Sequence, residues 1–323
     1  MNEITVDQDV LLLREELLSG LRKPQKTLPS KYFYDETGSA LFEEICKLQE
    51  YYPTRTETGI LRSNIRDIAA QIGTDCLLIE YGSGASVKIR LLLDHLDRIA
   101  GYVPIDISSE HLLQAAETLS RMYPDLMIQP VSADYTQDFE LPAIDVPHAR
   151  RVVFFPGSTI GNFTPREARH FLGHIATVAG NRGGLLIGVD LKKDVSILEA
   201  AYNDSRGITA AFNKNMLVRL NTEFDADFDP DTFRHRAVWN ALHGRIEMHL
   251  VSLHEQFVHV AGERILFRRS ESILTEYSYK YRPDEFAELA KPYFRVEHVW
   301  TDARHLFSVQ YLRCVSRRRS RPA

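Results

Sequence analysis

The pattern of hydrophobic positions predicts a sheet domain between about residues 76 and 190. In this region short apolar runs alternate with segments of helical periodicity, and five of the runs are typical of strands: CLLIEY, GYVPID, LMIQPVSAD, RVVFFPGS and GLLIGVD. The segments after the first, second, fourth and fifth runs have the pattern of helices. Because the strands are apolar on both faces and are separated by helices, we expect a parallel, doubly wound sheet.

Two further strands are expected to close this sheet near the C-terminus. The runs FRVEHVWTD and LFSVQYLRC are separated by only a few residues, which is typical of an antiparallel ribbon. Together with the five earlier runs they predict a seven-strand, Rossmann-like α/β sheet.

The rest of the chain has a different pattern, which predicts a second domain. Helical patterns occur at SILEAAYND and ITAAFNKNMLVRL, and a β-meander runs from FRHRAVWNALHGRIEMHLVSL to ILTEYSYKY, with a hairpin turn at His243 and Gly244. We therefore expect a discontinuous α+β substrate-binding domain from residues 9–56 plus 193–282. The sheet domain would comprise residues 57–192 plus 283–323.

Composition and charge narrow the class of partner. The 323 residues are 44% hydrophobic and 26% charged with a formal charge of −5, which favours a globular protein without a general affinity for nucleic acid. The basic tail RRRSRPA is short and terminal, and is expected to be solvated. No apolar run approaches a membrane span, and the N-terminus MNEITVDQDV lacks the profile of a signal peptide. Because the three cysteines are odd in number and widely spaced, we expect free thiols, which together with the missing signal profile favours a cytoplasmic location. The charge favours a small-molecule partner.

The first predicted strand ends in a glycine turn, within LLIEYGSGASVKIRLLLDHL. In open α/β sheets a ligand lies beyond the carboxyl ends of the strands, where glycines in the first strand-to-helix turn let the backbone approach it. Gly82 and Gly84 have this position. Val87 stands where a dinucleotide fingerprint has its third glycine, and the chain has no G-x-x-x-x-G-K-[ST] motif, so a pyrophosphate ligand is disfavoured.

Acidic residues around the turn favour an adenosine ligand without a pyrophosphate. Asp106 ends the second strand 24 residues after Gly82, near the spacing at which a carboxylate binds ribose hydroxyls. Asp134 ends the third strand and has the position to accept from an adenine amino group, while Tyr135 packs on the ring. Glu80 supplies the acidic surroundings that a sulfonium cation prefers, so S-adenosylmethionine satisfies all of these features. The alternatives are a tight turn without a ligand, and a helix N-cap role for Asp106.

Long, ordered stretches of the chain resemble one enzyme family. They are KTLPSKYFYDETGSALFEEI, EYYPTRTE, EYGSGASVKIR, FFPGSTIGNFTP, AYNDSRGITAAFN, RIEMHL and LTEYSYKYRP, within about residues 24 to 313. The sequence resembles the L-histidine Nα-methyltransferases of ergothioneine biosynthesis. The resemblance implies a class I methyltransferase sheet. It also implies three methyl transfers from S-adenosylmethionine to the α-amine of free histidine, which give hercynine and S-adenosylhomocysteine.

The resemblance further implies the residues of the site, and none of them is substituted in this chain. The family's cofactor residues correspond to Tyr34, Gly82, Lys88, Asp106, Asp134 and Tyr135. Its substrate residues correspond to Tyr51, Gly157, Asn162, Tyr202, Met248, Glu276 and Ser278. The expected partners are L-histidine and its mono- and dimethyl forms.

Methyl transfer to an amine requires orientation, a dry site and an unprotonated amine, and it needs no nucleophilic side chain. We assign the catalytic role to Tyr51 and Asn162, which can fix the amine lone pair by hydrogen bonds. The alternatives are a buried aromatic contact for Tyr51, and an Asx turn before a helix start at Thr164 for Asn162. Tyr34, Phe42 and Tyr51 are expected to form an aromatic wall for the quaternary ammonium product.

Recognition of histidine is expected to use two anchors. Tyr202 and Asn162 would bind the carboxylate of the substrate. Glu276 and Ser278 alternate onto one face of a strand, so both can reach the imidazole. The alternative for Glu276 is a solvated carboxylate.

Several other kinds of site are rejected. His170 and His174 have a zinc-binding spacing, yet Phe171 replaces the glutamate of H-E-x-x-H and no third ligand is near, so no metal is expected. Ser158 lacks the G-x-S-x-G elbow of a hydrolase. Two alternatives stay open: an N-methyltransferase for another amino acid or aromatic amine, and a non-catalytic protein that binds S-adenosylmethionine.

Overall fold

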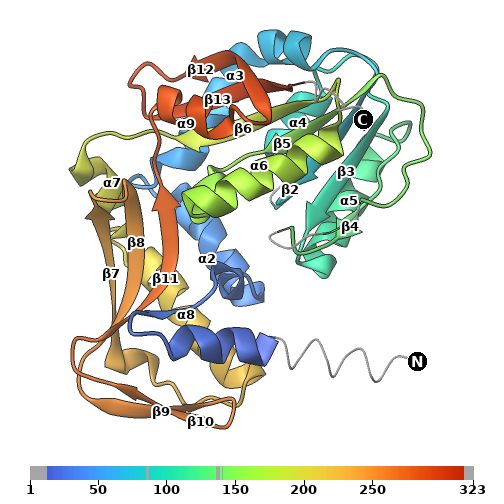
Figure 1. Ribbon diagram of the computed structural model, residues 1–323. Coiled ribbons are helices and arrows are strands. Elements are labelled where there is room, and N and C mark those ends of the chain that lie inside the picture. The colour runs from blue at the N-terminus through green and yellow to red at the C-terminus, as the bar shows by residue number, and fades with distance from the viewer. Residues whose placement is uncertain (1–12, 85–86, 136–138, 140, 316–323) are drawn as a thin grey trace, which may run out of the picture. The chain divides into compact units, whose positions relative to one another are not determined.

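The computed structural model describes residues 13–84, 87–135, 139 and 141–315, which form two compact units (Figure 1). The first unit combines Met1–Tyr52 with Lys193–Ser278, and the second combines Pro53–Lys192 with Tyr279–Ala323. The units of the structure divide at 52/53 and 278/279, whereas the sequence predicted boundaries at 56/57 and 282/283. The N-terminal MNEITVDQDV and the tail RRRSRPA lie outside the described residues.

The second unit contains the predicted doubly wound sheet. Its seven strands have the order β12-β13-β6-β5-β2-β3-β4, in which β2 to β6 are parallel and β13 is antiparallel to both neighbours. The strands are Cys76–Tyr81 (β2), Gly101–Asp106 (β3), Val131–Ser132 (β4), Arg150–Phe155 (β5), Gly184–Asp190 (β6), Phe294–Thr301 (β12) and Phe307–Cys314 (β13). The order reverses between β2 and β5, which is where sheets of this kind bind ligands.

Helices cover both faces of this sheet (Figure 1). They are Tyr52–Ile72 (α3), Val87–Leu93 (α4), Ser109–Met122 (α5), Pro165–Ala179 (α6) and Pro283–Ala290 (α9), with a short 3-10 helix at Thr159–Asn162 (η2). Phe154 of β5 lies in the core beneath α3, with Ile65 and Ile68 of that helix. The next residue, Phe155, points the other way and packs on Phe171 of α6 at a centroid distance of 4.9 Å. The alternation along β5 therefore fills both layers.

The third predicted strand, LMIQPVSAD, is wrong in length. Only Val131–Ser132 forms a regular strand, although Tyr102 still exchanges backbone hydrogen bonds with Met127 and Gln129 at 2.8 and 3.0 Å. Pro130 has no N–H to donate, so it interrupts the ladder between these two parts.

The first unit has a four-stranded sheet with the order β1-β11-β8-β7 and a separate β9-β10 hairpin. The strands are Lys26–Thr27 (β1), Phe233–Asn240 (β7), Arg245–Ser252 (β8), Gln256–Val260 (β9), Glu263–Phe267 (β10) and Ser272–Tyr279 (β11). The predicted turn between β7 and β8 is confirmed, because the Gly244 N–H donates to the Asn240 carbonyl at 2.8 Å. The simple meander is wrong beyond Ser252, where the chain first forms the β9-β10 hairpin and then returns as β11 beside β8.

The helices of the first unit pack around this sheet. They are residues 13–21, Glu36–Lys47 (α2), Val195–Tyr202 (α7) and Ile208–Glu223 (α8), with 3-10 turns at Ser30–Phe33 (η1) and Pro230–Thr232 (η3). Both helices that the pattern predicted here, α7 and α8, are present.

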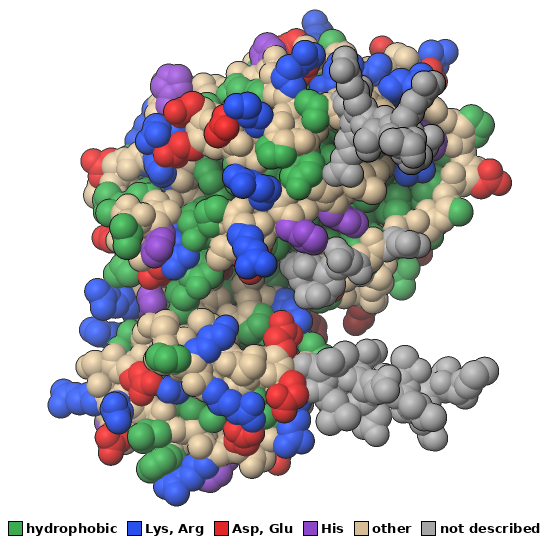
Figure 2. Space-filling model, viewed as in Figure 1, with side chains coloured by type: hydrophobic (Ala, Val, Ile, Leu, Met, Phe, Trp, Pro, Cys, Tyr) green, Lys and Arg blue, Asp and Glu red, His purple; other side chains and the backbone are tan. Residues whose placement is uncertain are grey.

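The distribution of charged side chains and the state of the cysteines are those of an ordinary globular protein. Acidic and basic side chains are interspersed on the face shown in Figure 2. All three cysteines are free thiols, and Cys76 is fully buried at the start of β2. Within the described part of the chain, no helix combines the length and the apolar character that crossing a bilayer requires.

Candidate active site

The glycine turn after β2 has the geometry that a close ligand needs. Gly82 has φ 73°, in the left-handed region, and its N–H donates to the Ile105 carbonyl at 2.8 Å. A Cβ at Gly82 would lie 3.4 Å from the Tyr135 hydroxyl oxygen. A side chain at this position would therefore be strained and would enter the space between the turn and Tyr135.

The Asp106 carboxylate is held beside this turn. One oxygen accepts from the Ser108 N–H at 3.0 Å, at the start of α5, and the other lies 3.5 Å from the Gly84 nitrogen. The N-cap alternative for Asp106 is wrong, because Ser108 is the N-cap of α5 and the bond from its N–H to Asp106 forms a local turn. The carboxylate also faces the glycine turn, so its expected bond to ribose hydroxyls stays a prediction.

Glu80, the last acidic residue before the turn, is buried with 3% of its surface exposed. The Tyr102 hydroxyl donates to its carboxylate. Burial raises the pKa of Glu80 to about 8 because desolvation penalises the charged form. The anionic form of Glu80, which the sequence-based prediction of a sulfonium ligand assumes, is therefore disfavoured near neutral pH.

Tyr135 belongs to an aromatic cluster next to the turn. Its ring lies 5.7 Å from Tyr81 and 6.0 Å from both Phe155 and Phe171, measured between centroids. Burial raises its pKa. Tyr135 therefore presents a neutral ring near Gly82, and Asp134 precedes it directly in the chain, as the sequence indicated.

The loop between β5 and α6 carries Gly157 and Asn162. Gly157 and Ser158 both have positive φ, at 81° and 58°, and the Asp190 N–H fixes the loop by donating to the Ser158 hydroxyl at 2.9 Å. Asn162 ends η2, and Thr164 begins α6 with a capping box. Hydrogen bonds to neighbouring elements therefore hold the conformation of this loop.

Lys88 and Gly157 meet at a buried carboxylate, Glu57 of α3. Lys88 forms an ion pair with Glu57, and the Gly157 N–H donates to the two carboxylate oxygens at 3.0 and 2.9 Å. Sequence reasoning missed Glu57. The motif EYYPTRTE contains it, but a glutamate in a helical pattern is usually a solvated residue, and no local pattern predicts contacts with residues far along the chain.

In the first unit, four aromatic side chains form a continuous row. Tyr34 packs edge-on against Phe42 at 5.8 Å, Phe42 against Tyr51 at 6.3 Å, and Tyr51 against Tyr202 at 6.2 Å, measured between centroids. Phe212 of α8, which sequence reasoning missed, packs on Tyr34 and Phe42 at 6.0 Å. The expected contacts among Tyr34, Phe42 and Tyr51 are therefore present.

Polar groups lie at the Tyr202 end of this row. The Tyr202 and Ser278 hydroxyls are hydrogen-bonded at 2.7 Å. The pKa of Tyr51 is raised well above its usual value, first by burial and then by neighbours that include Tyr202 and Glu276. Residues that the sequence divided between two anchors, Tyr202 and Ser278, are thus directly joined.

A buried polar network supports these groups. His235 of β7 donates from Nε2 to the Tyr202 carbonyl at 2.8 Å, and its Nδ1 accepts from the Asn213 amide at 2.9 Å. Thr275 donates to the Asn213 side-chain oxygen at 2.7 Å and lies 3.1 Å from the Met248 carbonyl. His235, Asn213 and Thr275 were missed because each stands next to other polar residues, in FRHRAV, AFNKNM and ILTEYS, where a polar side chain is usually solvated.

Comparison with known proteins decides the family. The model of the histidine-specific, S-adenosylmethionine-dependent methyltransferases matches residues 13–314. The chain belongs to this family. It is 42% identical to the histidine N-alpha-methyltransferase of Mycolicibacterium smegmatis, over 93% of this chain and 94% of that protein.

Two fungal proteins are more distant relatives. The ergothioneine biosynthesis protein 1 of Schizosaccharomyces pombe is 28% identical over 87% of this chain and 38% of that protein. The 4-dimethylallyltryptophan N-methyltransferase easF of Claviceps purpurea (strain 20.1) is 26% identical over 86% of this chain and 87% of that protein.

The glycine turn of the second unit brings together residues that are predicted to bind S-adenosylmethionine. Gly82 leaves open the space in front of Tyr135 that a Cβ would enter, and the acidic groups Glu80 and Asp106 lie at the same turn. The strand order, with the antiparallel β13 inserted between β12 and β6, is that of the class I methyltransferases.

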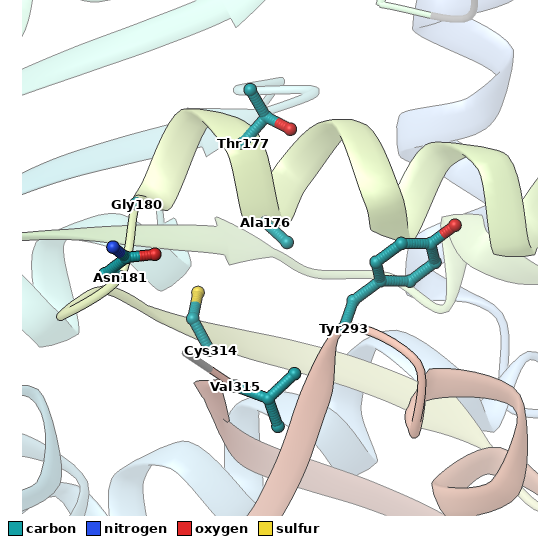
Figure 3. A pocket seen from close by; sticks show the side chains of 7 residues that line it. All are labelled: Ala176, Thr177, Gly180, Asn181, Tyr293, Cys314 and Val315. Carbon is teal, nitrogen blue, oxygen red and sulfur yellow. The ribbon is translucent and has the colours of Figure 1, made fainter. Parts of the chain in front are cut away.

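A separate cavity of the methyltransferase lies away from these residues. It has a volume of about 220 Å³ and is lined by Ala176, Thr177, Gly180, Asn181, Tyr293, Cys314 and Val315 (Figure 3). These residues lie where α6 ends and β13 ends, at the opposite end of the parallel strands from the glycine turn. No residue expected in the active site lines it.

One of the two histidines of α6, His174, lies beside the aromatic cluster. His174 contacts the Tyr81 hydroxyl at 3.3 Å and packs on Phe139 at 5.3 Å between centroids. Within the described residues, no group of three or more histidine, cysteine or acidic side chains is arranged to hold a metal ion.

Proposed function

We propose that the methyltransferase trimethylates the α-amino group of free L-histidine with S-adenosylmethionine, giving hercynine in the first step of ergothioneine biosynthesis. Family membership and the relative from Mycolicibacterium smegmatis support this proposal. So does the presence of every residue that the resemblance assigns to histidine.

The observation that carries the proposal is the aromatic row of the first unit with polar groups at its end. Tyr34, Phe42 and Tyr51 form a row of aromatic rings suited to a cation, and Tyr202 and Ser278 place two joined hydroxyls at its end. A substrate that becomes a quaternary ammonium and keeps a carboxylate and an imidazole needs both kinds of surface.

The chain's own residues have a limited chemical task. When bound, S-adenosylmethionine supplies a methyl carbon that the sulfonium has already activated for in-line displacement. Tyr51 and Asn162 orient the amine lone pair. The α-ammonium of free histidine must lose a proton before the nitrogen can attack, and a site that disfavours the charged form lowers the free energy of that step. Glu276 and Ser278 bind the imidazole.

Incubation with L-histidine and excess S-adenosylmethionine tests the proposal directly. Mass spectrometry should show histidine that has gained three methyl groups, and fragmentation should place all three on the α-nitrogen. Histamine, which lacks the carboxylate, is the matched control and should react much more slowly. Methyl groups on the imidazole, or no methylated histidine, would reject the proposal.

A second candidate is N-methylation of another amino acid or aromatic amine. The relative from Claviceps purpurea, named for a tryptophan derivative, favours it. Competition between histidine and tryptophan in one reaction distinguishes the two candidates, because the ratio of products gives the ratio of kcat/KM.

A further inference from the structure

Glu57 of α3 has an unusual environment for a glutamate. None of its surface is exposed. A buried carboxylate is expensive unless it is paired and hydrogen-bonded, so its partners indicate why it is there.

The partners come from the helix that follows the cofactor turn and from the loop after β5. Lys88, in the first turn of α4, forms the ion pair with Glu57, and its side chain is 18% exposed. The backbone of Gly157, in the loop after β5, donates to both carboxylate oxygens. A Cβ at Gly157 would lie 4.0 Å from the Lys88 ammonium nitrogen, so one carboxylate holds both groups at one place.

Strand β6 also packs against the Glu57 carboxylate. A Cβ at Gly188 would lie 2.0 Å from a Glu57 carboxylate oxygen, far inside van der Waals contact. Only glycine therefore leaves room for Glu57 in its observed position.

We propose that Glu57 is a positioning residue for the cofactor, which acts by orienting the Lys88 ammonium. Lys88 is the only cation among the residues assigned to S-adenosylmethionine, and the methionyl carboxylate is the anionic group of that ligand. A lysine side chain has many rotamers, so a buried carboxylate that selects one of them lowers the entropy lost on binding. This inference rests on the cofactor part of the proposed function.

Calorimetric titration with S-adenosylhomocysteine tests the proposal without requiring turnover or histidine. Glu57→Gln keeps the shape of the side chain and an acceptor for the Gly157 N–H, but it loses the ion pair. We expect its Kd to rise about tenfold or more. Wild-type affinity in a folded Glu57→Gln variant would overturn the proposal, since Glu57 would then only fill space.

A double-mutant cycle with Lys88→Met shows whether the effect passes through Lys88. In the Lys88→Met background, Glu57→Gln should change the Kd by less than about twofold. If the two substitutions raise the Kd by independent factors that multiply in the double variant, the proposal is overturned. If Glu57→Gln alone does not fold, Gly188→Ala takes its place in the cycle, because it displaces the carboxylate without removing its charge.

Two glycine substitutions give a matched pair that leaves the carboxylate itself unchanged. Gly188→Ala in β6 should displace Glu57 and raise the Kd for S-adenosylhomocysteine, as Glu57→Gln does. Gly59→Ala lies on α3, the helix of Glu57, but its Cβ meets no atom within 4 Å, so the Kd should not change. Equal affinities for the two variants would contradict the proposal. Because the readout is ligand binding, failure here leaves histidine methylation untouched, and failure of histidine methylation leaves this result standing.

Discussion

At the scale of single residues, Asp106 combines a structural bond with the expected cofactor contact. Replacing it with Ala should weaken S-adenosylmethionine by roughly 1.5–3 kcal/mol, because a charge-assisted bond to a ribose hydroxyl is lost. Calorimetric titration measures this change. Asp106→Asn is the control for the bond to the Ser108 N–H, since an amide oxygen can still accept it. Unchanged affinity in a folded Ala variant would refute the ribose assignment.

Glu80 gives a prediction about pH. Its folded-state pKa of about 8 lies above the ordinary value of 4.5, so the folded protein binds this proton more tightly than the unfolded chain does. The associated stability is present below pH 4.5 and is lost as the pH rises to about 8. At about 1.4 kcal/mol per pKa unit, the loss is on the order of 3–5 kcal/mol.

Glu80→Gln removes this titration and isolates its effect. From pH 5 to pH 8 the Tm of the wild type should fall relative to the Tm of Glu80→Gln. Above pH 8 the difference between the two Tm values should stay constant. Thermal unfolding at several pH values measures it. Parallel curves for the two proteins would show that Glu80 does not titrate in this range.

Glu276 is the residue on which specificity depends in the proposed function. Glu276→Ala should cost histidine roughly 1.5–3 kcal/mol in kcat/KM, because a charged hydrogen bond to the imidazole is lost. The larger and less polar cavity beside Met248 should leave tryptophan or phenylalanine unaffected, or improved. If the ratio of kcat/KM for histidine to kcat/KM for tryptophan is the same in the variant and the wild type, Glu276 does not recognise the substrate side chain.

At the scale of elements, the His235 network ties β7 and α8 to the end of α7. Burial lowers the pKa of His235, so the ring is neutral and bridges the Tyr202 carbonyl and the Asn213 amide. Stability from this neutral ring is lost as the pH falls below about 6.5 toward the lowered folded-state pKa.

His235→Ala should therefore raise the KM for histidine several-fold while leaving the affinity for S-adenosylhomocysteine unchanged. Steady-state kinetics and calorimetric titration measure the two quantities. His243→Ala, in the exposed turn after β7, is the matched control. Equal KM values for the two variants would show that the network does not position Tyr202.

The elements that sequence predicts well are those with a local cause. Apolar runs such as CLLIEY and GLLIGVD became strands because they are buried on both faces. The Thr164 and Pro165 pair began α6, as capping rules require. The failures have non-local causes: β4 is short because Pro130 interrupts the ladder, and β11 lies beside β8 through pairing that no sequence spacing specifies.

The same division holds for the site residues. Gly82 and Asp106 were accessible to sequence reasoning because turn chemistry and strand ends are local features. Glu57 and His235 were not, because what makes them important is contact with residues about 30 to 100 positions away. Family resemblance supplied the substrate residues, such as Met248, for which no local physical argument existed.

At the scale of the whole molecule, the number of methyl groups transferred is a test of the complete reaction. Histidine and its mono- and dimethyl forms share the carboxylate and the imidazole, so the same side chains should bind each of them. The three substrates differ only in the number of methyl groups on the α-nitrogen. With excess S-adenosylmethionine we expect hercynine as the endpoint, with three protons released for each molecule formed. Mass spectrometry and a pH-stat measure both. Accumulation of the monomethyl form would show that the aromatic row does not accept a quaternary ammonium.

The discontinuous units have a consequence for how the chain folds during synthesis. The first 52 residues leave the ribosome well before residues 193–278, with which they form a unit. In the second unit, β6 is fully buried in the finished sheet but has an open edge until β13 has been made. Neither unit can therefore be completed before the other is largely synthesised, and long-range pairing of this kind is slow. A chain that ends before Phe307 would keep the apolar edge of β6 exposed, and it should aggregate rather than give a smaller working enzyme.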